Sequence, residues 1–243
     1  MSQSVRRGVP RSRGPGRAIV VTLVVVALLV VAADVVLRLV AERWLEGRVQ
    51  DTLALESRPD LDIGGFPFLT QFARGEYERV EATFEELSFG GVRLDEVAVV
   101  LRNLEFNQSD VLTGSAGTVR IRRGRGSVEI REPSFNGFLR DQGVPVTVEF
   151  REDEVVATTR VQAGGQEATA SASGPIRLDG RTLVFEPGEV EVDGAFGVPP
   201  AALSFSVELP PLFRGVRYER VRVEEALLAL DADFTDTALE LED

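Results

Sequence analysis

A run of uncharged residues near the N-terminus, Ala18–Ala33, limits the folds open to this chain more than any other feature. As a helix the run is about 24 Å long, and about 34 Å long if the helix continues to Val40. The hydrocarbon core of a bilayer is about 30 Å thick, so a membrane-spanning helix is predicted over residues 18–40. Five Arg and no acidic residue precede it in residues 1–17, which predicts a cytoplasmic leader and an extracytoplasmic body over residues 41–243.

Two interpretations of this segment remain open. In the first it is a signal anchor that stays attached and holds the protein in the cell membrane as a single-pass protein. In the second it is a signal peptide, cleaved after the small residues Val31-Ala32-Ala33. We favour the anchor, because the run is long for a signal peptide and the helical pattern continues past it without a break.

The residues that follow, 34–56, predict an amphipathic helix ended by Arg58-Pro59. Its apolar residues recur at spacings of three and four, with Arg and Glu on the opposite side: Val36, Leu39, Val40, Trp44, Leu45 and Val49. We expect this apolar side to pack on the domain that follows. For Trp44 the alternative is an anchor at the membrane interface.

The body begins with the stretch Ile63–Tyr77, in which four bulky apolar residues lie within the seven positions Phe66–Phe72 and follow neither a helical nor a strand period. Its two leading glycines permit a turn that is closed to other residues. Pro67 fixes its own backbone and disfavours a helical Phe66, so no helix is expected to pass through. The stretch is interpreted as a fixed apolar turn, and Gly75 frees the chain again.

Beyond this turn, alternating apolar residues predict a series of short strands separated by Gly-rich turns. One such turn is placed at Gly124-Arg125-Gly126, between strands around residues 119–121 and 128–130. Two breaks, Pro133–Gln142 and Pro199–Val207, predict short helices. The expected fold is α+β: one antiparallel sheet, hairpin after hairpin, with helices against it.

Composition excludes several functions. The chain has no Cys and no His, which removes thiol and imidazole chemistry and the usual ligands of zinc or copper. Residues 18–243 carry 22 Arg against 39 acidic residues, an acidic balance that argues against nucleic acid as a partner. Carboxylate pairs such as Asp231/Asp233 are the remaining catalytic candidates, but in an alternating strand both would point to the solvated face. We therefore expect no enzyme, no metal and no cofactor.

The stretch GGFPFLTQFARGEYERVEATFEEL, behind an Arg-rich leader, a membrane segment and an amphipathic helix, resembles the LmeA-type phospholipid-binding family. The element Leu209-Pro210-Pro211-Leu212 adds to this resemblance, which covers roughly residues 34–235. The family implies a tubular lipid-binding fold of the bactericidal/permeability-increasing type, in which a long helix packs in a strongly curved sheet. It also implies phospholipid binding without catalysis in the bacterial cell envelope. The segment that follows Leu212 is short and acidic, which departs from the family pattern.

With phospholipid and membrane as the expected partners, the apolar turn and the helix predicted at Pro133–Gln142 are candidates for binding acyl chains. The candidate lipid-binding residues are Phe66, Pro67, Phe68, Leu69, Phe72, Phe135, Phe138 and Leu139. Four basic residues near the expected hairpin tip are candidates for the headgroup: Arg120, Arg122, Arg123 and Arg125. The alternative is a non-catalytic adaptor domain of the envelope with a filled core and no lipid cavity.

Overall fold

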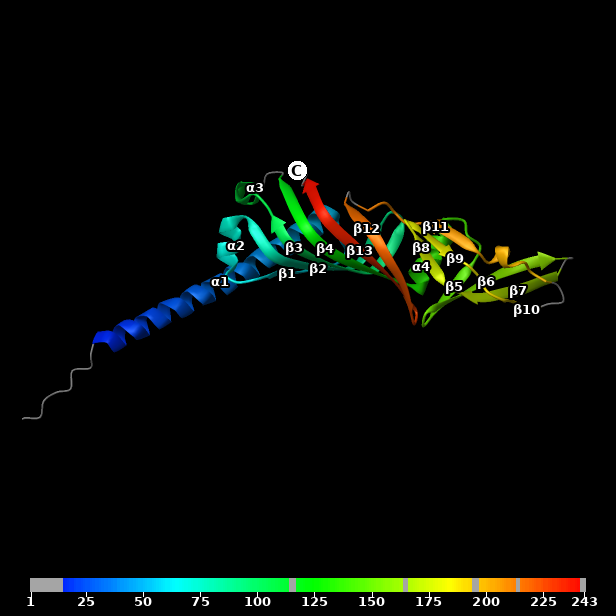
Figure 1. Cartoon of the computed structure of the whole chain (residues 1–243), viewed down its shortest axis with the longest axis horizontal. Coiled ribbons are helices and arrows are strands. Elements are labelled where there is room, and N and C mark those ends of the chain that lie inside the picture. Colours follow the sequence, from blue (N-terminus) through cyan, green and yellow to red (C-terminus); the bar gives the residue numbers. More distant parts are fainter. Residues whose placement is uncertain (1–14, 114–116, 164–165, 194–196, 213–214, 241–243) are drawn as a thin grey trace, which may run out of the picture.

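The computed structural model describes residues 15–113, 117–163, 166–193, 197–212 and 215–240, so Arg6, Arg7, Arg11 and Arg13 of the leader lie outside the described residues. Helix α1 (Pro15–Leu53) is continuous, and its N-terminal half projects from one end of an elongated body (Figure 1). The strands of that body pair antiparallel. The α+β class predicted from the sequence is confirmed, whereas the domain boundary at residue 40 stays a prediction.

The largest sheet contains six strands in the order β1-β2-β3-β4-β13-β12. Its strands are β1 (Asp60–Gly64), β2 (Glu76–Phe89), β3 (Val92–Glu105), β4 (Thr118–Arg131), β12 (Val216–Glu224) and β13 (Leu227–Glu240). The C-terminal half of α1 runs behind this sheet in Figure 1 and contacts its β1 edge. The short helix α3 (Gln108–Thr113) connects β3 to β4. The strong curvature implied by the resemblance stays a prediction.

In the described part of the chain the remaining strands form two smaller sheets, so the expectation of a single continuous sheet is wrong. One sheet has the order β10-β7-β6-β5 and the other β11-β9-β8. Their strands are β5 (Thr147–Arg151), β6 (Glu154–Ala163), β7 (Gln166–Gly174), β8 (Ile176–Asp179), β9 (Thr182–Phe185), β10 (Val190–Asp193) and β11 (Phe205–Glu208). Hairpin signals report only neighbours along the chain, whereas β13 returns to pair with β4, about a hundred residues earlier.

Strand β4 runs unbroken through Gly124 and Gly126, so the predicted hairpin there is wrong. Gly124 lies opposite Phe234 of β13 and Gly126 opposite Ala232, and the Phe234 side chain takes the space that a side chain on either glycine would need. A Cβ on Gly124 would lie 3.2 Å from the Cβ of Phe234 and 2.8 Å from a methyl carbon of Leu101. The glycines therefore make room for an aromatic ring across the sheet and do not mark a turn.

The other predicted helices are partly confirmed. Helix α4 (Glu132–Asp141) forms at the first break. At the second, only the 3-10 turn η1 (Pro200–Ala202) is helical, and the chain then enters β11. Phe135, Phe138 and Leu139 of α4 lie in a closed core between the three sheets, together with residues such as Phe150, Phe185, Leu203 and Phe205.

The apolar turn is shorter than expected, because helix α2 (Phe68–Arg74) begins directly after Pro67. A proline in the interior of a helix disrupts it, but a proline is well tolerated where a helix starts. The helix ends at Gly75, whose φ of +72° is the left-handed conformation that glycine adopts easily. No helix passes through Pro67, as predicted, but the interpretation of Phe68–Phe72 as part of a fixed turn is wrong.

Candidate functional site

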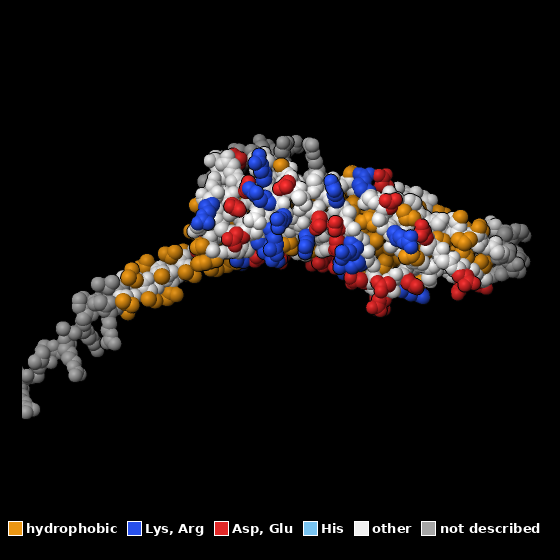
Figure 2. Space-filling model, viewed as in Figure 1, with side chains coloured by type: hydrophobic (Ala, Val, Ile, Leu, Met, Phe, Trp, Pro, Cys, Tyr) orange, Lys and Arg blue, Asp and Glu red, His pale blue; other side chains and the backbone are white. Residues whose placement is uncertain are grey.

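One face of the six-stranded sheet is apolar across every strand. The strand registers place the following residues on it: Leu61, Ile63, Val80, Ala82, Phe84, Val97, Val99, Leu101, Val128, Val216, Val221, Leu230, Ala232 and Phe234. We call this the inner face. The alternate residues form the outer face, where Figure 2 shows Arg and acidic side chains spread over the strands on the side away from α1. The sheet therefore has one apolar and one polar face.

The middle of the inner face is incompletely covered. Its central residues on β2 and β3 are only half-buried: Val80, Ala82, Phe84, Val97, Val99 and Leu101. In the closed core around α4, by contrast, Phe135, Leu139 and Phe150 are at most 2% exposed. An apolar surface that the protein's own side chains leave partly open is the typical lining of a site for an apolar ligand.

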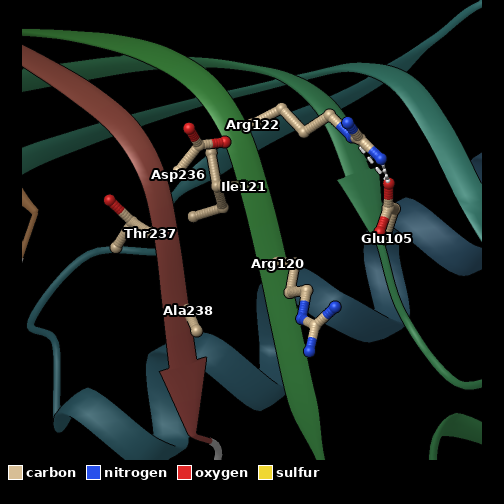
Figure 3. A pocket seen from close by; sticks show the side chains of 7 residues that line it. All are labelled: Glu105, Arg120, Ile121, Arg122, Asp236, Thr237 and Ala238. Atoms are coloured by element: carbon tan, nitrogen blue, oxygen red, sulfur yellow. Dashed lines mark hydrogen bonds and ion pairs between the residues drawn. The ribbon is translucent and has the colours of Figure 1, made fainter.

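Among the described residues, hollows of two different sizes border the six-stranded sheet. The larger, of about 300 Å³, lies between the ends of β3, β4 and β13 and is lined by Glu105, Arg120, Ile121, Arg122, Asp236, Thr237 and Ala238 (Figure 3). Within it the Arg122 guanidinium pairs with Glu105 at 2.5 Å. The smaller, of about 40 Å³, has an apolar lining that includes Val128, Leu230, Leu209 and Leu212. Neither hollow combines the size and the apolar lining expected of an enclosed acyl-chain cavity, so the open inner face is the candidate site.

The α2 end of this face is fixed to α1 by a buried carboxylate. Asp34, only 4% exposed, accepts hydrogen bonds from the backbone N–H groups of Phe68 and Leu69 at 2.8 and 2.9 Å. These N–H groups begin α2 and have no partner inside that helix. Arg38 and Glu42 lie one and two turns further along α1, and both contact β1. Glu42 accepts a hydrogen bond from the backbone N–H of Ile63 at 2.9 Å.

Contacts between Gly64, Gly65 and Gln71 account for the spacing of these motif residues around α2. The Gln71 side chain donates to the carbonyl of Gly64 at 3.2 Å and accepts from the N–H of Glu78 at 2.9 Å, so it joins β1 to β2. A Cβ on Gly65 would lie 2.6 Å from the Gln71 amide nitrogen, where a residue larger than glycine would clash. The Gly-Gly pair and the Gln thus form one structural unit.

Aromatic rings extend this unit. Phe68 stacks on Tyr77 with 5.7 Å between ring centroids, and Phe106 contacts both Tyr77, at 4.9 Å, and Phe72, at 5.9 Å. Burial raises the pKa of Tyr77 to about 12, so its phenol stays neutral at physiological pH. Phe66 and Leu69 do not join the cluster: they are 62% and 44% exposed.

The three groups of predicted site residues lie in different places. Phe66, Pro67, Phe68, Leu69 and Phe72 are together at α2. Phe135, Phe138 and Leu139 lie in the closed core at α4, far along the body from α2 (Figure 1). Arg120, Arg122, Arg123 and Arg125 are exposed along β4 and not at a hairpin tip. The structure does not bring these groups into one site, and their roles stay predictions.

Sequence reasoning missed the two parts that the structure emphasises. The inner-face residues of β2 and β3 were visible as alternation, for example Val97, Val99 and Leu101, but alternation alone does not say that a face stays open. Asp34 was visible as the first charge after the uncharged run. Its partners Phe68 and Leu69 lie 34 and 35 residues away, and no local pattern connects them.

Comparison with known families agrees with this geometry. The family model for LmeA-like phospholipid-binding proteins matches residues 32–233, from just before Asp34 into β13. The chain belongs to the LmeA-like phospholipid-binding family. The matched region therefore contains the α2 unit, the closed core and nearly all of the inner face. Comparisons with curated proteins and with solved structures find no match.

The acidic pair considered for catalysis lies on the outer face of this LmeA-like protein. Asp231 and Asp233 alternate with the inner-face residue Ala232, as the strand period predicts. Asp231 accepts from Arg222 at 3.0 Å, and Asp233 lies 4.0 Å from Arg125. Both carboxylates thus have cationic neighbours on the solvated side of the sheet.

Glu129, also on the outer face, leads to a prediction about stability. Glu129 lies opposite Glu96 in the β3–β4 register, and partial burial, together with Glu96 and Glu224, raises its pKa above the usual range. At a pH above the ordinary Glu pKa the unfolded chain carries this carboxylate in its charged form at no cost, whereas the folded protein is destabilised by the charge. Glu129→Gln should raise the free energy of unfolding by about 0.5 kcal/mol at pH 7.

This gain should vanish below about pH 4, where the carboxyl is protonated in both states. The measurement is denaturant unfolding of the full chain in detergent at both pH values, with the exposed Glu167→Gln as the control. An equal gain at both pH values would show that charge is not the cause.

Proposed function

We propose that this protein is a membrane-anchored, extracytoplasmic phospholipid-binding protein of the cell envelope, which holds acyl chains against the inner face. The observation that carries the proposal is the row of half-buried apolar residues across β2 and β3. Each methylene that moves from water onto such a surface contributes about 0.8 kcal/mol. An acyl chain along the inner face would complete a burial that the chain's own residues leave unfinished.

Membership of the LmeA-like phospholipid-binding family supports the ligand class. Helix α1 supports the anchor: among the described residues it is the helix long and apolar enough to cross a membrane. The five Arg of the leader favour the cytoplasm for the N-terminus, which leaves the inner face outside the cell. The acidic balance of residues 18–243, 22 Arg against 39 acidic residues, argues against nucleic acid as a partner.

A matched pair of substitutions on β3 tests the proposal. Val99 lies on the inner face and its neighbour Ala98 on the outer face, and both are half-buried. Val99→Glu puts a charge where the acyl chain is expected, and desolvating that charge is costly. Phospholipid bound per protein should fall at least about tenfold, the effect of 1.4 kcal/mol.

Ala98→Glu should keep the normal amount of lipid. Bound phospholipid is measured by mass spectrometry of organic extracts, after extraction and extensive washing in a detergent that contains no phospholipid. Equal thermal unfolding of the two variants checks that both fold. If Val99→Glu retains as much lipid as Ala98→Glu, acyl chains do not bind at the inner face.

A further inference from the structure

Helix α1 has its polar side turned toward the protein just beyond the uncharged run. Asp34, Arg38 and Glu42, four residues apart, all face the domain, where they contact α2 and β1. The apolar residues Val35, Val36, Leu37, Leu39 and Val40 are 43–58% exposed. A helix on the surface of a water-soluble domain shows the opposite arrangement. The sequence prediction that this apolar side packs on the domain is therefore wrong for residues 35–40.

Trp44 has the same orientation. It is 56% exposed, so it does not pack on the sheet. Together with Trp44, the exposed apolar residues of 35–40 form an apolar strip, which continues from exposed apolar residues earlier in α1 such as Val26. An outward apolar surface that ends at a Trp is typical of a helix leaving the hydrocarbon for the headgroup layer.

The length of the helix gives the depth of this strip. From Arg17 to Asp34 the rise is about 25 Å, against a hydrocarbon core of about 30 Å. With Arg17 at the cytoplasmic edge, Asp34 lies about 5 Å inside the outer edge, and Val40 lies about 9 Å further along, in the headgroup layer. A charged side chain at the depth of Asp34 needs partners, and Asp34 has them in the N–H groups of Phe68 and Leu69.

These hydrogen bonds hold the start of α2 at the level of Asp34. The exposed side chains of Leu69 and of Phe66, two residues before Phe68, lie at the same end of the domain. Phe66 is 62% exposed and Leu69 44% exposed. Such large apolar side chains are unfavourable in water and favourable in a lipid leaflet.

We propose that the α2 end of the domain is embedded in the outer leaflet of the membrane that α1 spans, with Phe66 and Leu69 inserted into the hydrocarbon boundary. The inference rests on the anchor in the proposed function. It also adds a route, because the inner face then begins inside the leaflet and a phospholipid reaches it without crossing water. The partner surface is the lipid of the anchoring membrane itself.

The absence of native Cys makes a direct test simple, since one introduced Cys carries a single fluorescent label. Phe66→Cys and Leu69→Cys place an environment-sensitive label at the tip of α2. Val26→Cys, in the middle of the span, is the deep reference. Thr52→Cys, exposed in the last turn of α1, is the reference in water. The full chain is reconstituted into vesicles of phosphatidylethanolamine and phosphatidylglycerol, some with acyl chains brominated near the headgroup and some with acyl chains brominated near the methyl end, where the Val26 label is expected.

The labels at Phe66 and Leu69 should emit at shorter wavelength than the label at Thr52 and should lose emission in brominated vesicles. If both behave like the Thr52 label while the Val26 label is quenched, the α2 end lies in water and the inference is wrong. If the Val26 label is itself unquenched, α1 does not span the bilayer. In that case the anchor of the proposed function fails, and the inference fails with it.

Discussion

Replacing Asp34 with Ala should lower the free energy of unfolding by about 3 kcal/mol and release α2 from α1. The carboxylate accepts two backbone hydrogen bonds in a buried position, and hydrogen bonds to charged groups contribute about 1.5–3 kcal/mol each. Two N–H groups at the start of α2 would lose their partner. Denaturant unfolding of the full chain in detergent measures the loss, and faster tryptic cleavage after Arg74 reports the release of α2.

Two further variants make this prediction specific. Asp34→Asn keeps one acceptor oxygen without the charge, so its loss of stability should lie between those of the wild type and Asp34→Ala. Asp51→Ala removes an exposed carboxylate from the same helix and should change the free energy of unfolding by less than about 0.5 kcal/mol. Equal stabilities of Asp34→Ala and Asp51→Ala would mean that the contact between α1 and α2 contributes nothing.

Replacing Phe135 with Ala should lower the free energy of unfolding by about 3–5 kcal/mol. Its side chain has no exposed surface, and its ring centroid lies 5.4 Å from that of Phe150 and 6.4 Å from that of Phe205. Removing the ring leaves a cavity in the closed core that the three sheets cannot easily collapse to fill. The exposed Phe66→Ala is the matched control and should leave stability nearly unchanged.

This substitution also separates two roles for α4. A core residue affects bound lipid only through folding, whereas a lipid-contacting residue affects it directly. Phe135→Ala should therefore retain phospholipid under conditions where the protein is still folded. Loss of lipid with unchanged stability would instead confirm the role predicted for Phe135 from the sequence.

Elements set by local period could be predicted from the sequence. The uncharged run and the spacing that follows it predicted the continuous helix α1, and Pro133 with its apolar neighbours predicted α4. The apolar sides of β2 and β3 were visible in the alternation of Val97, Val99 and Leu101. In each case the determining interactions lie within a few residues of one another, which is the range that a sequence pattern reports.

Features set by distant contacts could not be predicted in this way. Gly124 and Gly126 have the local signature of a turn, but their surroundings are decided by Phe234, more than a hundred residues later. The helical period of residues 34–49 likewise gives two sides of a helix without saying which medium each side meets. The orientation of Asp34 toward α2 decides that question, and it appears only in the structure.

The central claim, that acyl chains lie on the inner face, is tested most directly by photo-crosslinking with p-benzoylphenylalanine in the membranes of living cells. The probe replaces Phe84, on the inner face of β2, and adds a benzoyl group that extends from this half-buried ring; its neighbour Thr83, on the outer face, is the control. Irradiation of the Phe84 variant should give a covalent phospholipid adduct, identified by intact-mass spectrometry, and the Thr83 variant should give none. Adducts of equal yield at both positions, or a Phe84 probe that crosslinks only to the protein itself, would contradict the account.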